Sequence, residues 1–175
     1  MKAHLNLIVV VIFTMALCAP LNSLGAKKNK SSFGIGARRH AKNTTLDDLP
    51  FEDGDWSYGA IYQKGNDRAA WQLGALYAPE PGTNSMDYAI TPQANLVVKQ
   101  GFWQGGVGLL KTYTVTADGK SDWSSLYWQG MAGFELPLGG FTLTAYAYYT
   151  FDKWGNITDF ETDALEFGGW LTYAF

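Results

Sequence analysis

The chain has 175 residues, a formal net charge of −3 and only 17% charged residues. This slight acidic excess gives no basic surface for nucleic acid, and the length suits one domain with one core. Glycine and aromatic residues are abundant, with 20 Gly, 10 Tyr, 10 Phe and 7 Trp. Since Leu-Lys-Glu-rich helical stretches are absent, this composition favours an all-β fold.

The first 25 residues differ from the rest of the chain. Lys2 precedes an almost unbroken apolar run over residues 5–17, which is too short to span a bilayer as a helix. We therefore expect residues 1–25 to be a cleaved signal peptide and residues 26–175 to form one β-domain. A retained N-terminal anchor and a lipoprotein attached through Cys18 are the alternatives. Loss of Cys18 with the signal peptide would leave no thiol for a disulfide or a metal site.

The remainder of the chain alternates apolar residues with small or polar ones, as strands with one apolar face do. Seven clear runs and one shorter run near the N-terminus follow this period of two. The predicted strands cover residues 32–38, 56–63, 68–77, 86–99, 102–114, 125–136, 141–151 and 164–175. They are mostly nine to fifteen residues long, which exceeds the usual length in soluble sheets and matches tilted membrane strands. Pro92 predicts an edge or a bulge, because proline lacks a donor for the ladder.

The connections between these strands alternate in length. Short connections lie at 64–67, 99–101 and 137–140, and longer ones at 39–55, 79–85, 115–121 and 152–162. Outer-membrane barrels show this asymmetry, with short periplasmic turns, longer external loops and an even number of strands. The pattern therefore predicts an all-β fold, an eight-stranded antiparallel up-and-down transmembrane β-barrel.

The C-terminal residues 168–175 resemble the last strand of bacterial outer-membrane barrels, with aromatic or apolar residues at alternate positions and a terminal phenylalanine. This resemblance implies that Leu171, Tyr173 and Phe175 are read by the barrel assembly machinery. The whole plan resembles the small barrels of the OmpA transmembrane domain and OmpX kind, without a motif for one subfamily. It implies a location in the bacterial outer membrane, in contact with its lipid and lipopolysaccharide.

The strand face opposite the apolar one should fill the barrel, because eight strands leave a lumen just wide enough for side chains. Glycines alternate with bulky aromatic residues on this face, and polar residues on it predict a buried network, since buried charges need partners. The predicted members are Arg68, Gln72, Gln93, Asn95, Lys99, Gln104, Gln129, Glu135 and Glu166. We interpret this network as a structural filling of the lumen rather than as an ion path.

Candidate catalytic and metal-binding residues are few. His40 is the only histidine after the signal peptide, and residues 38–40 are interpreted as a solvated basic stretch. No nucleophile, base and acid are placed together by the pattern, so no catalytic residue is predicted. The acidic segment 47–55 matches no calcium loop and is interpreted as a solvated external loop. No metal and no cofactor are expected.

The predicted function is a structural or surface-interaction role through external loops, with a ligand that the sequence does not identify. One alternative is a lipid-modifying outer-membrane enzyme. Another is a soluble periplasmic, lipocalin-like barrel that binds an apolar ligand among its aromatic residues.

Overall fold

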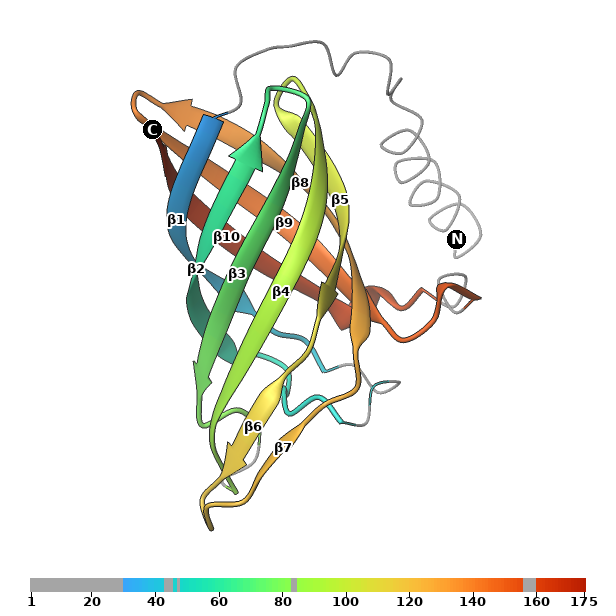
Figure 1. Ribbon diagram of the computed structural model, residues 1–175. Helices are drawn as coiled ribbons and strands as arrows, with labels where there is room; N and C mark the ends of the chain where they lie inside the picture. The colour runs from blue at the N-terminus through green and yellow to red at the C-terminus, as the bar shows by residue number, and fades with distance from the viewer. Residues whose placement is uncertain (1–29, 43–45, 47, 83–84, 156–159) are drawn as a thin grey trace.

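The computed structural model describes residues 30–42, 46, 48–82, 85–155 and 160–175. Within these residues the chain forms a closed antiparallel β-barrel (Figure 1). Its eight strands are β1 (Lys30–Arg39), β2 (Trp56–Gly65), β3 (Ala69–Pro79), β4 (Met86–Gln100), β5 (Trp103–Leu110), β8 (Tyr127–Leu138), β9 (Phe141–Phe151) and β10 (Leu165–Ala174). Each pairs with the next, and β1 pairs with β10 to close the ring. The predicted eight-stranded barrel is confirmed, whereas the expected signal peptide lies outside the described residues.

Two further strands, β6 (Tyr113–Thr116) and β7 (Ser121–Trp123), form a hairpin beyond the barrel wall. The prediction of one strand over 102–114 and a loop over 115–121 is therefore wrong. Strand β4 pairs with β6 up to Ile90 and with β5 from Gln93 onward. Pro92 lies in the gap between the two ladders, where its missing amide donor costs no ladder hydrogen bond.

The two ends of the barrel differ. At the turn end, β2–β3, β4–β5 and β8–β9 are joined by tight connections, and the C-terminus lies at this end (Figure 1). Gly101 and Gly139 have φ values of 63° and 66° in two of these turns. The loop end carries residues 40–42 and 48–55, the β6–β7 hairpin and the single-turn helix η3 (Thr162–Ala164). Among the described residues, no helix is long and apolar enough to cross a membrane.

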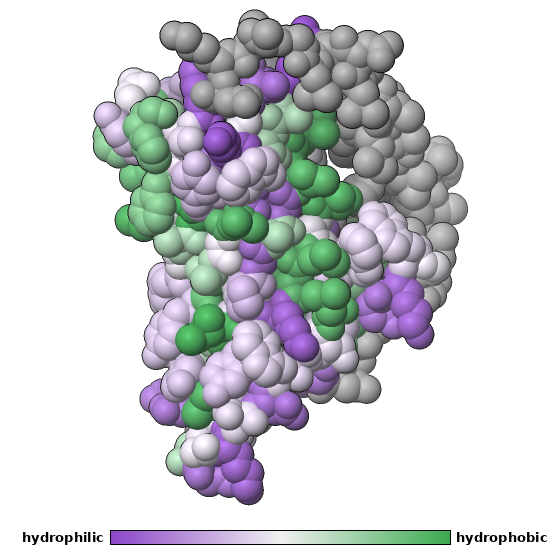
Figure 2. All heavy atoms as spheres, viewed as in Figure 1, coloured by the Kyte–Doolittle hydropathy of each residue, from purple (hydrophilic) through white to green (hydrophobic). Residues whose placement is uncertain are grey.

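The outer face of the barrel is apolar. Large hydrophobic side chains project from every barrel strand, including Ile35 on β1 and Leu96 on β4. Figure 2 shows patches of hydrophobic residues on the visible barrel wall, among residues of intermediate and low hydropathy, and a group of hydrophilic residues at the tip of the β6–β7 hairpin. Aromatic pairs near the turn end, Tyr62–Trp71 and Phe141–Tyr173, have ring centroids 5.4 and 5.3 Å apart.

The lumen is filled with side chains. An apolar cluster fills its middle and comprises Ile61, Leu76, Val97, Met131, Tyr146, Tyr148 and Trp170. Glycines make room for the large rings: a Cβ on Gly36 would lie 2.6 Å from the Trp170 ring and 2.2 Å from the Gly169 carbonyl oxygen. The alternation of small and bulky residues therefore packs the barrel interior.

Candidate functional site

A buried arginine is at the centre of the lumen near the loop end. Arg38 points inward from β1 and forms an ion pair with Glu166 on β10. Its Nη1 donates a hydrogen bond to Gln129 Oε1 at 3.0 Å, and its Nη2 donates to Thr150 Oγ1 at 3.3 Å. The guanidinium also lies 4.2 Å above the Tyr148 ring. These contacts offset part of the cost of removing the charge from water.

His40, directly after β1, connects Glu166 to a serine. Its Nδ1 lies 2.6 Å from Glu166 Oε1, and its Nε2 lies 2.9 Å from Ser57 Oγ. The three residues are 2%, 7% and 1% exposed, respectively. The Phe51 ring stacks on the imidazole with centroids 3.7 Å apart. The order of hydroxyl, imidazole and carboxylate is that of a nucleophile, a base and an orienting acid.

A chain of amide side chains continues this network across the lumen. Gln129 Nε2 donates to Gln93 at 3.0 Å and to Asn95 at 2.6 Å. Asn95 Nδ2 donates to Gln72 at 3.4 Å, and Gln72 Nε2 donates to Gln63 at 2.8 Å. These bonds link β8, β4, β3 and β2, so hydrogen-bonded side chains span the interior and it is not an open channel.

A second polar group lies nearer the turn end. Lys99 Nζ and Gln104 Nε2 donate to Glu135 Oε2 at 2.8 and 2.7 Å, and Tyr146 donates to Gln104 Oε1 at 2.5 Å. Lys99 and Glu135 also line a polar cavity of about 430 Å³ at this end. We name this cavity the polar vestibule; its other lining residues include Ser32, Thr144 and Thr172.

The structure places most of the predicted lumen residues inside the barrel. These residues are Gln72, Gln93, Asn95, Lys99, Gln104, Gln129, Glu135 and Glu166. Arg68 is not among them: it is exposed in the turn before β3, and its amide donates to Asn66 Oδ1 at 2.9 Å. The reason is that β3 begins only at Ala69, so the inward and outward alternation does not yet apply to Arg68.

The interpretation of residues 38–40 as a solvated stretch is wrong for two of the three. Arg38 and His40 are buried, and only Arg39 is exposed, with an ion pair to Asp53 at 3.3 Å. One signal in the sequence indicated this: Arg38 follows Gly34 and Gly36 at a period of two, on the inward face of the same strand. Ser57 shares the inward face of β2, but no pattern singled it out.

A segment at the loop end, residues 48–55, covers this network, and we name it the cap. Leu49 packs against two apolar clusters, which comprise Leu46, Leu110 and Tyr127, and Phe51, Ala78 and Ala89. Asp48 accepts hydrogen bonds from the Tyr127 hydroxyl and the Ser125 amide. Asp55 Oδ2 accepts from the amides of Glu52 and Gly82 at 2.8 and 2.7 Å. The cap is therefore held by apolar packing and by carboxylate contacts at both of its ends.

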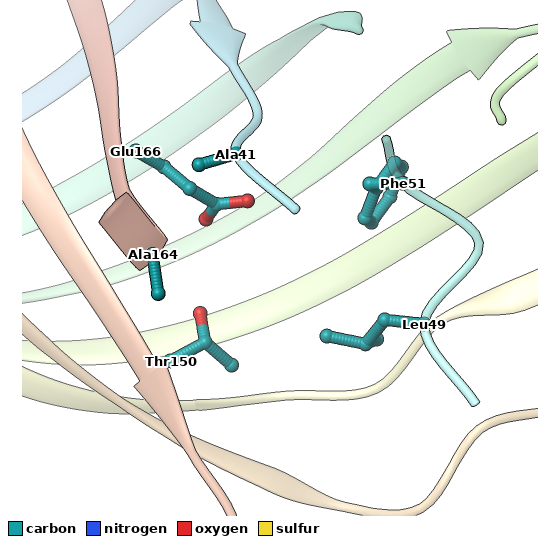
Figure 3. Close-up of a pocket in the computed structure, with 6 residues that line it drawn as sticks. All are labelled: Ala41, Leu49, Phe51, Thr150, Ala164 and Glu166. Atoms are coloured by element: carbon teal, nitrogen blue, oxygen red, sulfur yellow. The ribbon is translucent and has the colours of Figure 1, made fainter. Parts of the chain in front are cut away.

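The space between the cap and the network is small. A cavity of about 10 Å³ lies there, which is about the room of one water molecule. Figure 3 shows the residues that line it: Ala41, Leu49, Phe51, Thr150, Ala164 and Glu166. Among the described residues, no group of three or more His, Cys, Asp or Glu side chains is arranged to hold a metal ion. Asp47, the first residue of the acidic segment, lies outside them.

The cap should open in acid. Partial burial raises the pKa of Asp48, but hydrogen bonds from Tyr127 and Ser125 outweigh it, so that pKa lies below the ordinary value of 3.8. The contact therefore stabilises the closed cap fully above pH 3.8 and is lost as the pH falls through the lowered pKa. Pepsin cleavage beside Phe51, normalised to cleavage of the unfolded chain, should increase below that point. Unchanged protection in acid would contradict this role of Asp48.

Comparisons with known proteins show similarity at the level of structure. No family model and no curated protein matches the sequence. Ail, the attachment invasion locus protein of Yersinia pestis, solved with the heparin analogue sucrose octasulfate, matches with 17% identity and a TM-score of 0.42, covering 85% of this chain and 100% of that one. Neisserial surface protein A matches with 11% identity and a TM-score of 0.47, covering 85% and 97%. By its own strand pairing, the chain is a small eight-stranded antiparallel β-barrel.

Proposed function

We propose that the protein is an outer-membrane barrel with a structural or surface-interaction role. We further propose that it binds its partner through the β6–β7 hairpin and that its lumen does not serve as a pore. The observation that carries this proposal is the contrast between the lumen and the β6–β7 hairpin. The lumen is crossed by hydrogen bonds and covered by the cap, whereas the hairpin pairs with the first residues of β4 and projects beyond the barrel wall (Figure 1). The partner is a ligand at the cell surface, and the sequence does not identify it.

The outer face supports a membrane location. Leu96 and Trp103 are 64% and 69% exposed, and such side chains lose about 25 cal/mol for each Å² of apolar surface left in water. A lipid bilayer removes this cost. We infer export through a signal peptide at residues 1–25, assembly by the barrel assembly machinery, and contact with outer-membrane lipid and lipopolysaccharide. A soluble lipocalin-like barrel is disfavoured, because its aromatic residues would pack inward.

The hairpin offers a strand edge to a partner. Strand β7 pairs with β6 through Tyr113↔Trp123 and Val115↔Ser121, and all three residues of β7 are exposed. The Lys120 carbonyl oxygen accepts a hydrogen bond from the Thr116 amide of β6. Because successive residues of an antiparallel strand face opposite sides, the amide of Ser121 points away from β6. Exposed strand edges bind extended segments of other proteins by adding a strand.

A binding experiment tests this proposal. Displayed peptides selected on the detergent-solubilised barrel should bind the Ser121→Pro variant at least about tenfold more weakly, because proline removes an outward donor without removing a bond to β6. Lys64→Ala, at the turn end, is the matched control and should bind as the original chain does. Equal binding by all three would contradict the hairpin surface, and steady conductance in a planar bilayer would contradict the closed lumen.

The C-terminal residues permit a separate test of assembly. Leu171, Tyr173 and Phe175 all project outward, and Phe175 is 71% exposed. Deletion of Phe175 should reduce the folded fraction in membranes severalfold, measured by the mobility of unboiled samples on gels. Phe141→Ala is the control, since Phe141 is also an outward aromatic residue at the same end. Equal loss in both variants would show that lipid-facing area, and not a terminal signal, is responsible.

A further inference from the structure

We propose that Ser57, His40 and Glu166 form a latent site for hydrolysis of acyl esters, kept closed by the cap. This inference goes beyond the proposed function, which uses only the exterior of the barrel. It starts from the geometry of three residues that lie on β2, directly after β1 and on β10.

The hydrogen bonds have the order that nucleophilic catalysis requires. The Ser57 hydroxyl is 2.9 Å from His40 Nε2, and His40 Nδ1 is 2.6 Å from Glu166 Oε1. With its Nδ1 proton donated to the carboxylate, the imidazole presents a lone pair to the hydroxyl. The second carboxylate oxygen of Glu166 is engaged by Arg38, which fixes the carboxylate in position. Glu166 is thus a positioning residue for His40.

A second observation separates this site from a merely structural network. Arg38 Nε is the one buried side-chain polar atom, among the described residues, without a hydrogen-bond partner. Arg38 lies directly opposite Ser57 in the pairing of β1 and β2. An unsatisfied buried donor is costly in a structural network, because its lost contact with water is not replaced. In a catalytic site, a donor that is left free in this way can stabilise a developing oxyanion.

The cap blocks access to the three residues, and the surfaces beneath it indicate which class of substrate would bind there. Phe51 covers the imidazole, and the cavity of about 10 Å³ beneath the cap has no room for an ester. Displacement of the cap would uncover His40 and the apolar surfaces of Leu110, Tyr127 and Ala78, against which the cap packs. An apolar mouth beside a nucleophile suits an ester with a long acyl chain.

The reaction balances with water as the only co-reactant. The Ser57 oxygen bonds to the ester carbonyl carbon while its proton passes to His40 Nε2. The bond from that carbon to the alcohol oxygen then breaks, and the alcohol leaves with the proton from His40. Water next attacks the acyl-serine with His40 again as the base, which releases the carboxylic acid and restores the Ser57 hydroxyl.

An alkyl fluorophosphonate, which bonds to activated serine oxygens and releases fluoride, tests this proposal on the full-length protein in detergent. The cap should be loosened by Asp48→Asn, which weakens the contact to Tyr127. We expect a mass-mapped adduct on Ser57, formed at least about tenfold faster in Asp48→Asn than in the original chain. The Ser57→Ala variant should form none, whereas Ser32→Ala, which removes another lumen hydroxyl, should react normally.

Further variants separate positioning from folding. Glu166→Gln should lose most labelling while the boiling-dependent gel shift shows a folded barrel, and Glu166→Asp should restore part of it. If Glu166→Gln does not fold, labelling of the original chain and of Asp48→Asn still shows whether Ser57 is an activated nucleophile. The absence of a Ser57 adduct from both folded proteins, or an unchanged adduct in Ser57→Ala, would overturn the proposal and leave the network with a structural role.

Discussion

Replacement of Glu166 by leucine is expected to lower the free energy of unfolding by about 3–5 kcal/mol, because it leaves a buried charge without its partner. Arg38 is almost completely buried, and Glu166 is its ion-pair partner among the described residues. His40 loses the acceptor at Nδ1 in the same variant. Denaturant unfolding in lipid vesicles, followed by tryptophan fluorescence, measures this loss.

The matched control is Glu135→Leu, which breaks the lumen ion pair between Lys99 and Glu135. Lys99 and Glu135 line the polar vestibule, where water can solvate the remaining charge. We expect less than half the destabilisation seen for Glu166→Leu. Equal losses would show that burial does not distinguish the two pairs. Simultaneous replacement of Arg38 and Glu166 by leucine should recover part of the stability, since no charge then remains unpaired.

Substitution of Gly36 by valine is expected to cost about 3 kcal/mol or more, because a side chain there overpacks a filled lumen. Its Cβ would lie 2.2 Å from the Gly169 carbonyl oxygen, which belongs to the neighbouring strand and cannot move aside cheaply. The same unfolding measurement gives the cost. The strand pairing that closes the ring is the part of the structure that this variant disrupts.

Gly155→Ala is the control for this substitution. A Cβ at Gly155 meets no atom within 4 Å, and the residue lies in the connection between β9 and β10. Its effect should be within about 0.5 kcal/mol, as for most surface positions. A similar loss for both variants would mean that glycine content itself, and not the close approach at Gly36, determines stability.

The strands and their faces were predictable because each is encoded locally. In β9, every second residue from Phe141 to Tyr149 is apolar, and the observed bounds are those predicted. The alternation of short and long connections then indicated the strand number. The break between β5 and β6 was not predicted, because alternation continues through Leu109 and Tyr113. Both strands pair with β4, but the neighbour on their other side changes from β8 to β7. Periodicity indicates the face of a residue but not its partner strand.

The candidate site was predictable only in part for the same reason. Glu166 was placed in the lumen by its strand pattern, but the partners that bury Arg38 and His40 lie 128 and 126 residues away in sequence. A basic triplet at the end of a strand is usually solvated, so nothing local indicated that a carboxylate would meet it. Only closure of the sheet brings these side chains together.

The position of Arg38 on the first strand and of Glu166 on the last has a consequence for how the barrel forms. The ion pair joins the first and the last strand of the barrel, and no sheet of consecutive strands can make it before β1 contacts β10. Until then both charges remain hydrated, since the inner face of an open sheet is accessible to water. The favourable contact and the loss of hydration therefore occur in one step, at ring closure. A partly assembled sheet gains nothing from this pair, so the pair distinguishes the complete barrel from every shorter intermediate.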